Sequence, residues 1–167
     1  ENIGYFLRKN TPEECKTSDF QDISLWREFN YQTLKWMEET YPGVILAPMT
    51  INREPYFDEI VSRLRAEGIE IRHIILSASR ETLLKRLKKR SLGRLSREEF
   101  AVQAIEKSLD FFAFRPEEEK VATDFLTVDQ VVEQVAGRCG LVLKEDRRSW
   151  LKRYLDRGKV VLEHIRS

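Results

Sequence analysis

The chain has 167 residues, of which 41% are hydrophobic and 34% charged, and its formal net charge at pH 7 is +1. This length and composition suit one folded domain with a sizeable core and exclude a disordered chain. The small net charge gives no general attraction to nucleic acid or to anionic lipid.

The cysteines, the apolar runs and the first residue of the chain indicate which kind of protein to expect. Cys15 and Cys139 lie far apart in the sequence and lack metal-ligand spacing, so we interpret both as free thiols in a reducing cytoplasm. No apolar run approaches the roughly 20 residues of a membrane span, and no signal peptide opens the chain. The sequence begins at Glu1 without an initiator Met, so we expect a processed, truncated or partial chain.

The first half of the chain predicts helices followed by a strand. Apolar residues at helical spacing indicate a short helix over 2–9 and a long helix over 23–40, which Pro42 and Gly43 stop. The continuous apolar run 44–49 predicts a strand that is buried on both faces. The expected inward face of the long helix consists of Leu25, Trp26, Phe29, Leu34, Trp36 and Met37.

Helix and strand patterns alternate along the rest of the chain, which is typical of parallel βαβ units. Helices on both faces are expected to cover such a sheet. The predicted fold is therefore α/β, a three-layer α/β/α domain with a parallel sheet over 1–145, followed by a basic amphipathic helix over 146–167. We predict helices over 54–67, 79–89, 97–110, 129–138 and 147–165, a basic turn over 91–94, and strands over 69–76 and 121–126.

Several stretches carry a resemblance to a known family. They are Asp19-Phe20, 25–31 (Leu-Trp-Arg-Glu-Phe-Asn-Tyr), 44–51 (ending Pro-Met-Thr-Ile), 55–57, 79–87, Thr123-Asp124 and 164–166. Together they resemble the tunicamycin-resistance family of P-loop proteins over nearly the whole chain. The resemblance implies a nucleoside-monophosphate-kinase-like fold with a lid at about 86–113.

The same resemblance implies a function. It points to a nucleotide-binding resistance protein, an ATP-dependent phosphotransferase that uses ATP and Mg²⁺ to modify a nucleoside-like antibiotic such as tunicamycin. The alternative is a non-enzymatic protein that binds or sequesters the antibiotic at the membrane surface. A nucleic-acid partner is not expected, because the basic residues are not interleaved with aromatic ones.

The phosphate-binding loop of that family, G-x-x-x-x-G-K-S/T, does not occur among the seven glycines of the sequence. In related kinases the strand that bears this loop separates the strands that match 44–49 and 69–76. Without it, buried backbone groups would stay unpaired at about 1–3 kcal/mol each, against a total stability of about 5–15 kcal/mol. We therefore expect roughly 30 further residues before Glu1; a rearranged three-stranded sheet is the alternative.

A dense cationic stretch surrounds the predicted basic turn, and phosphoryl transfer needs positive charge of this kind. Arg86 and Arg90 are four residues apart and share one helix face. The resemblance implies that Arg86, Arg90 and Arg94 act catalytically by closing over the ATP phosphates. It also implies that Asp124, with Arg86 and Arg90, contacts the nucleotide. A solvated helix face and a helix-capping aspartate are the alternatives.

The expected acceptor site combines the long helix with the end of the first predicted strand. Arg27 suits an anionic group, because its guanidinium donates two parallel hydrogen bonds, and the aromatic rings suit a base or sugar. Alternatively, the aromatic residues are core and Arg27 forms a surface ion pair. Ligands of open α/β sheets bind at the carboxyl ends of strands. The predicted substrate-binding residues are Trp26, Arg27, Asn30, Tyr31, Met49 and Thr50.

Pro48-Met49, the two histidines and the C-terminal helix each carry a further prediction. Pro48-Met49 stands where many P-loop enzymes have an acidic residue near magnesium, which favours the binding-only alternative. His73 and His164 are isolated and predict no catalytic or metal site. The basic amphipathic helix at the C-terminus suits peripheral contact with an anionic membrane, or docking on its own sheet or on a second subunit in a homodimer.

Overall fold

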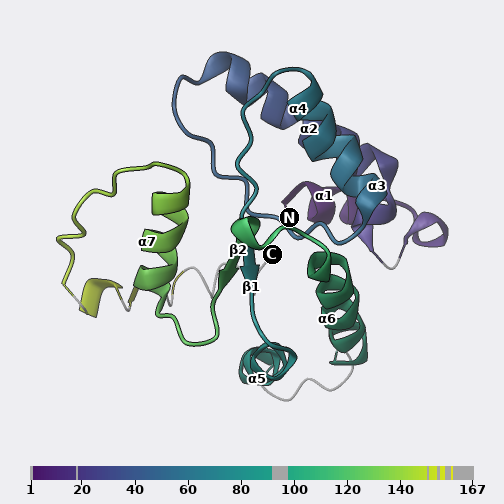
Figure 1. The fold of residues 1–167 in the computed structure, drawn as a ribbon. Helices are drawn as coiled ribbons and strands as arrows, with labels where there is room; N and C mark the ends of the chain where they lie inside the picture. Colours follow the sequence, from purple (N-terminus) through teal and green to yellow (C-terminus); the bar gives the residue numbers. More distant parts are fainter. Residues whose placement is uncertain are drawn as a thin grey trace. The chain divides into compact units, whose positions relative to one another are not determined.

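The computed structural model describes residues 2–17, 19–91, 98–149, 151–153, 155–156 and 159 (Figure 1). Of Asn2, Arg90, Ser91 and 98–100, the backbone alone is described. The chain divides into two compact units. Unit 1 comprises Glu1–Met49 with Leu143–Ser167, and unit 2 comprises Thr50–Val142.

Unit 1 is built from helices. Its elements are α1 (Asn2–Asn10), the 3-10 turns η1 (Glu13–Cys15) and η2 (Phe20–Asp22), and α2 (Ser24–Thr40). Asp19 begins η2, because its side chain accepts a hydrogen bond from the backbone N–H of Gln21. Thr11 closes α1 by donating its hydroxyl to the carbonyl of Leu7. The predicted long helix over 23–40 is confirmed.

The buried face of α2 differs from the prediction. Leu25, Phe29 and Trp36 are 50%, 45% and 63% exposed, so the expected apolar inward face is wrong at these positions. The side that packs in unit 1 combines two aromatic and two polar residues. Both polar side chains bond within the unit: Asn30 Nδ2 donates to the carbonyl of Trp26 at 2.8 Å, and Arg27 donates to the carbonyl of Gln21. The buried residues of α2 are Trp26, Arg27, Asn30 and Tyr31.

The predicted strand over 44–49 is also wrong. This stretch has no regular secondary structure, and Val44 and Leu46 are 59% and 76% exposed. Pro42 and Pro48 each lack the N–H that a sheet ladder requires. Among the described residues, no segment pairs with it, so its apolar side chains have no partner strand to bury them.

Unit 2 contains the sheet. Its elements are α3 (Glu54–Phe57), the π-helical turn η3 (Asp58–Ser62), α4 (Arg63–Ala66), β1 (Ile75–Ser77), α5 (Arg80–Ser91), α6 (Glu98–Ala113), η5 (Glu117–Glu119), β2 (Lys120–Ala122) and α7 (Val128–Arg138). Gly68, at φ +88°, and Gly140, at φ +66°, follow the helical stretches that end in α4 and α7. The helices predicted over 54–67, 79–89 and 129–138 are confirmed.

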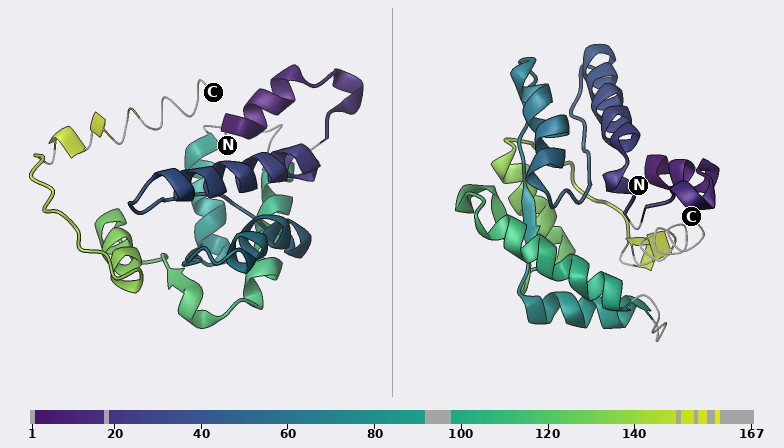
Figure 2. Two further views of the ribbon diagram at one scale, coloured as in Figure 1. Left: turned by 90° about the horizontal axis from the view of Figure 1, so that it is seen from above. Right: turned by 90° about the vertical axis from the view of Figure 1, so that its right-hand side faces the viewer.

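The strands β1 and β2 are parallel and hydrogen-bonded, with Ile75 opposite Lys120 and Ser77 opposite Ala122. Both are shorter than the predicted strands over 69–76 and 121–126. The described part of unit 2 is thus an α/β arrangement with a two-stranded parallel sheet. α5 packs against α6, and α7 packs against β2 (Figures 1 and 2).

The core of unit 2 draws its buried side chains from the helical stretch 54–66 and from the sheet. Ile60 and Val121 are fully buried, and Phe57, Leu64 and Ile75 are at most 5% exposed. Burial of each such side chain stabilises the fold by about 1.5–3 kcal/mol. No helix in the described ranges is long and apolar enough to cross a membrane.

Candidate ligand-binding sites

The carboxyl end of β2 is tied to α5 by Arg86. Its guanidinium donates to Thr123 Oγ1 at 3.0 Å and to the Thr123 carbonyl at 2.7 Å. Thr123 is 6% exposed, and its hydroxyl donates to the carbonyl of Ser77 at the end of β1, at 2.9 Å. One predicted catalytic residue therefore joins two strand ends to a helix.

Asp124 lies beside this contact and binds the residue before α5. Its carboxylate accepts from Ser79 N at 2.9 Å and from Ser79 Oγ at 2.6 Å. Bonds from the Ser79 and Thr82 side chains and from the Ser79 backbone lower the pKa of Asp124 to about 2, and the charge of Arg86 adds to this effect. Asp124 is thus ionised at neutral pH and binds the start of α5. The capping alternative expected it to cap the element that follows it, but Thr127 caps that helix, α7.

The structure brings Arg86 and Asp124 together through Thr123, at the carboxyl ends of β1 and β2. Ligands of α/β proteins commonly bind at this edge. The side chain of Arg90 and residue Arg94 lie outside what the structure describes. The nucleotide-binding roles of these residues stay predictions.

In unit 1 the predicted substrate-binding residues form a buried stripe on α2. Trp26 and Tyr31 are each 2% exposed, and Arg27 and Asn30 are 8% and 9% exposed. Arg27 Nη1 donates to the carbonyl of Gln21, which fixes the guanidinium against η2. These side chains are part of the packed corner between η2 and α2. Of the other two predicted residues, Met49 is half-buried and Thr50 is exposed.

An open groove of about 730 Å³ runs along α1 and η1 in unit 1. Three cations line it against one acid, and Lys16 pairs with Glu13, which lowers the pKa of that carboxyl. A basic groove with two aromatic rings can hold an anionic ligand that carries a planar ring. Its lining residues are Tyr5, Phe6, Arg8, Lys9, Glu13, Lys16 and Thr17.

Unit 2 has a second open groove, of about 630 Å³, between the start of α3 and the end of α6. Arg115 forms one wall: its guanidinium lies 4.2 Å from the Phe57 ring centre and 4.8 Å from that of Phe111, and it pairs with Glu54 at 2.7 Å. Phe114 is 92% exposed beside it. Sequence reasoning missed this groove, because nothing in the spacing of 52–54 and 107–116 shows that they meet.

A site for ATP and Mg²⁺ needs cations beside the phosphates and oxygen ligands for the metal. Among the described residues, no three His, Cys, Asp or Glu side chains gather as a metal site. Asp124 is engaged by Ser79, and Arg86 by Thr123. Arg86 and Asp124 are the described side chains at the strand ends that would contact a nucleotide, and Mg²⁺ would take one or two carboxylates besides the phosphates. His73 is half-buried and bonds through Nδ1 to Glu119 Oε2 at 2.8 Å, as expected of a packed histidine.

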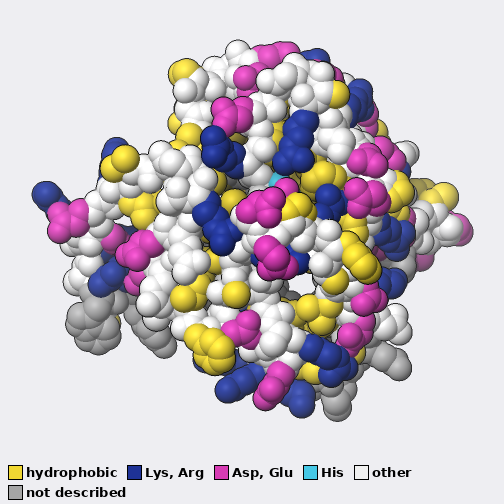
Figure 3. All heavy atoms as spheres, in the orientation of Figure 1, with side chains coloured by type: hydrophobic (Ala, Val, Ile, Leu, Met, Phe, Trp, Pro, Cys, Tyr) yellow, Lys and Arg dark blue, Asp and Glu magenta, His cyan; other side chains and the backbone are white. Residues whose placement is uncertain are grey.

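Charges on the described surface are mixed. On the face shown in Figure 3, Lys and Arg side chains stand next to Asp and Glu side chains, for example over α5 at the bottom of the view. Mixed charge of this kind makes no single-sign field across that face. A ligand there would be held by individual side chains.

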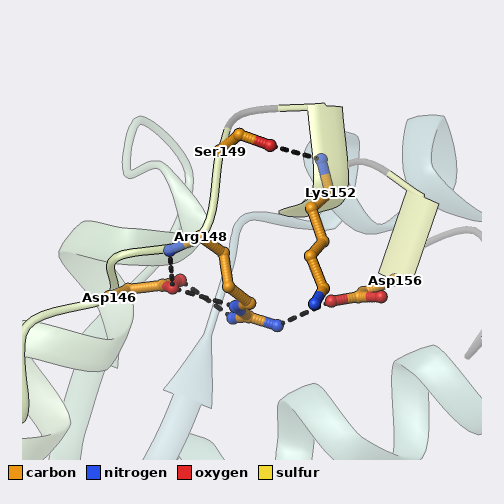
Figure 4. A network of polar contacts seen from close by, with 5 residues as sticks. All are labelled: Asp146, Arg148, Ser149, Lys152 and Asp156. Carbon is orange, nitrogen blue, oxygen red and sulfur yellow. Dashed lines mark hydrogen bonds and ion pairs between the residues drawn. The ribbon is translucent and has the colours of Figure 1, made fainter.

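The start of the predicted C-terminal helix is held by ion pairs (Figure 4). Arg148 contacts Asp146 at 2.8 Å and Asp156 at 2.9 Å, and Ser149 Oγ accepts from Lys152 N at 3.3 Å. Arg148 lowers the pKa of Asp146, and both aspartates raise that of Arg148. The charge of Arg148 is therefore balanced within the segment. Of the helix predicted over 147–165, residues 150, 154, 157, 158 and 160–165 lie outside the described residues.

Comparison with known proteins finds a likeness among solved structures. No protein-family model matches the chain, and no curated protein matches it. Among solved structures, the tunicamycin resistance protein of Deinococcus radiodurans matches with a TM-score of 0.67 and 24% sequence identity. The match covers 87% of this chain and 82% of that one. The chain thus has the fold of that protein, and the resemblance found from sequence motifs is supported independently.

Proposed function

We propose that this protein binds a nucleoside-like antibiotic of the class to which tunicamycin belongs and so takes part in resistance to it. The observation that carries the proposal is the shared fold, which covers 87% of the chain at a TM-score of 0.67. The neighbour is a tunicamycin resistance protein. The motifs 25–31 and 44–51 resemble the same family independently of the fold.

The described geometry adds two places where a small molecule could be held. The first is the polar corner at Arg27, Asn30 and Tyr31 together with the basic groove of unit 1. The second is the edge of the sheet at Arg86 and Asp124 in unit 2. Both combine cations with rings or hydroxyl groups, which suits a polar ligand with planar parts.

Phosphoryl transfer from ATP, in a three-layer P-loop kinase-like domain, is the finer form of the proposal. The family resemblance supports it, and so does the cationic stretch that contains Arg86 and Arg90. Sequestration of the drug without chemistry is the second candidate. It is favoured by Pro48-Met49, which stands where many P-loop enzymes have an acidic residue near magnesium.

One incubation distinguishes phosphoryl transfer from sequestration. The intact protein is mixed with ATP, Mg²⁺ and tunicamycin, and the drug is followed by mass spectrometry. A gain of about 80 Da per phosphoryl group, as expected when a kinase transfers a phosphoryl group, supports transfer. Unchanged mass together with drug bound in equimolar amount supports sequestration. Unmodified and unbound drug contradicts the proposed function.

A further inference from the structure

Two buried polar atoms in unit 1 have no hydrogen-bond partner among the described residues: Gln21 Oε1 and Trp26 Nε1. Their residues are 8% and 2% exposed, so water does not compensate either atom from the surface. Native proteins pair nearly all such atoms, and an unpaired one calls for an explanation. Gln21 Oε1 is an acceptor and Trp26 Nε1 is a donor, so the two atoms are chemically complementary to one ligand edge.

The backbone around both residues is firmly held, so the unpaired atoms are not a consequence of loose structure. Gln21 N donates to Asp19 Oδ1 at 2.9 Å, and the Gln21 carbonyl accepts from Arg27. The Trp26 carbonyl accepts from Asn30 at 2.8 Å. These main-chain groups have hydrogen-bond partners, and the atoms without one are at the ends of the Gln21 and Trp26 side chains.

We propose that Gln21 Oε1 and Trp26 Nε1 bind the amide edge of a pyrimidine-type base. Such an edge places an N–H donor next to a carbonyl acceptor, which matches the acceptor of Gln21 and the donor of Trp26. A site built from buried polar groups discriminates strongly, because a ligand that lacks the matching group leaves them unpaired.

The basic groove of unit 1 supplies a place for the anionic part of the same ligand. Tyr5 lines the groove, and its ring centre is 6.5 Å from that of Phe20, which in turn is 5.4 Å from that of Trp26. A continuous set of rings therefore joins the groove to the corner. Arg8 and Lys9 give the groove the charge that a phosphate or pyrophosphate group requires.

Entry of a base requires some opening of this corner, because both atoms are buried without ligand. Half-buried Phe20 packs against Gly4, where an added Cβ would come within 2.7 Å of the ring. The side chains of α1, η2 and α2 are closely fitted here. Binding would consequently change the environment of Trp26, which gives a direct signal.

This inference rests on the proposed function for its biological meaning, since it names the part of a nucleoside that is recognised. Its test uses uridine 5′-monophosphate and its N3-methyl derivative, titrated into the intact protein by calorimetry. N3-methylation removes the N–H donor and leaves the sugar and phosphate unchanged. We expect the unmethylated nucleotide to bind at least about tenfold more tightly.

The indole N–H of Trp26 provides the second readout in ¹⁵N NMR spectra, where the variant Trp26→Phe assigns its resonance. The nucleotide should shift that resonance, and Gln21→Leu should weaken binding by about tenfold or more. Gln21→Glu keeps an acceptor and should retain part of the affinity. The control Gln32→Leu changes an exposed glutamine of α2 and should alter affinity less than about twofold.

Three results would overturn the inference: no binding of uridine monophosphate, equal binding of the N3-methyl derivative, or an unmoved Trp26 resonance. An unmoved resonance would mean that the two atoms hold only a water molecule. Tunicamycin binding without nucleotide binding would overturn this inference and leave the proposed function standing. Nucleotide binding at Trp26 without tunicamycin binding would overturn the proposed function and leave this inference standing.

Discussion

Arg86 donates two hydrogen bonds to Thr123, one to its hydroxyl at 3.0 Å and one to its carbonyl at 2.7 Å. Through Thr123, which donates to Ser77, this contact joins α5 to the ends of both strands of unit 2. The residue to which the family resemblance assigns catalysis therefore also has a structural contact. Its substitution should be measured for stability as well as for activity.

Arg86→Ala is expected to lower the free energy of unfolding by about 1–2 kcal/mol, because a buried threonine loses its charged donor. Urea denaturation followed by circular dichroism measures this change. Lys89→Ala changes an exposed lysine of the same helix, is the matched control and should change stability by less than about 0.5 kcal/mol. Equal stability of both variants would show that the contact to Thr123 contributes nothing.

Asp124 predicts a pH dependence with a definite sign. Its pKa is about 2 in the folded chain against an ordinary value of 3.8, so the folded state favours the ionised form. The stabilisation is fully present above about pH 4 and is lost as pH falls towards 2. The difference in stability between the wild type and Asp124→Asn should therefore shrink over that interval. Urea titrations between pH 6 and about pH 2 measure it, with Asp110→Asn as control; a constant difference would contradict the assignment.

Arg115 should be important for the structure of the unit 2 groove. Arg115→Ala removes contacts with Phe57 and Phe111 and the ion pair with Glu54, and should cost about 1–3 kcal/mol. Chemical denaturation provides the measurement. In the control, Arg72→Ala breaks an exposed pair with Glu70 and should cost less than about 0.5 kcal/mol. If the two variants lose equal stability, the ring contacts of Arg115 are not stabilising.

The C-terminal segment predicts a selective effect of charge on membrane contact. Lys152 and Lys159 are exposed, whereas the charge of Arg148 is balanced by Asp146 and Asp156. If the segment contacts anionic lipid, which is one of the two alternatives from the sequence, Lys152→Gln with Lys159→Gln should reduce co-sedimentation with phosphatidylserine vesicles, and Arg148→Gln should reduce it less. Wild-type protein that leaves these vesicles unbound would favour docking on the chain itself or on a second copy.

Helices were predicted well from the sequence because their signals are local. The Pro42-Gly43 stop after α2 and the glycines Gly68 and Gly140 act through backbone geometry that adjacent residues determine. The strand predicted over 44–49 failed for the opposite reason. An apolar run forms a strand only when another strand pairs with it, and Val44 and Leu46 have no such partner among the described residues.

In the candidate sites, too, local signals could be predicted from the sequence and contacts between distant residues could not. Arg86 and Asp124 could be selected from sequence because they lie in motifs of the resembled family, although their contacts with Thr123 and Ser79 could not. Gln21 was missed, since an unpaired side-chain atom has no sequence signal. The face of α2 was misjudged because hydrophobicity alone does not reveal that Arg27 can be buried when the Gln21 carbonyl accepts its bond.

The most direct test of the central claim is calorimetric titration of tunicamycin into the intact protein, with and without ATP and Mg²⁺. The proposed function predicts saturable binding of one drug per chain with a dissociation constant in the micromolar range or below, about −8 kcal/mol or stronger. Arg27→Ala should weaken this binding more than Arg72→Ala does. Absence of saturable binding under both conditions would contradict the account.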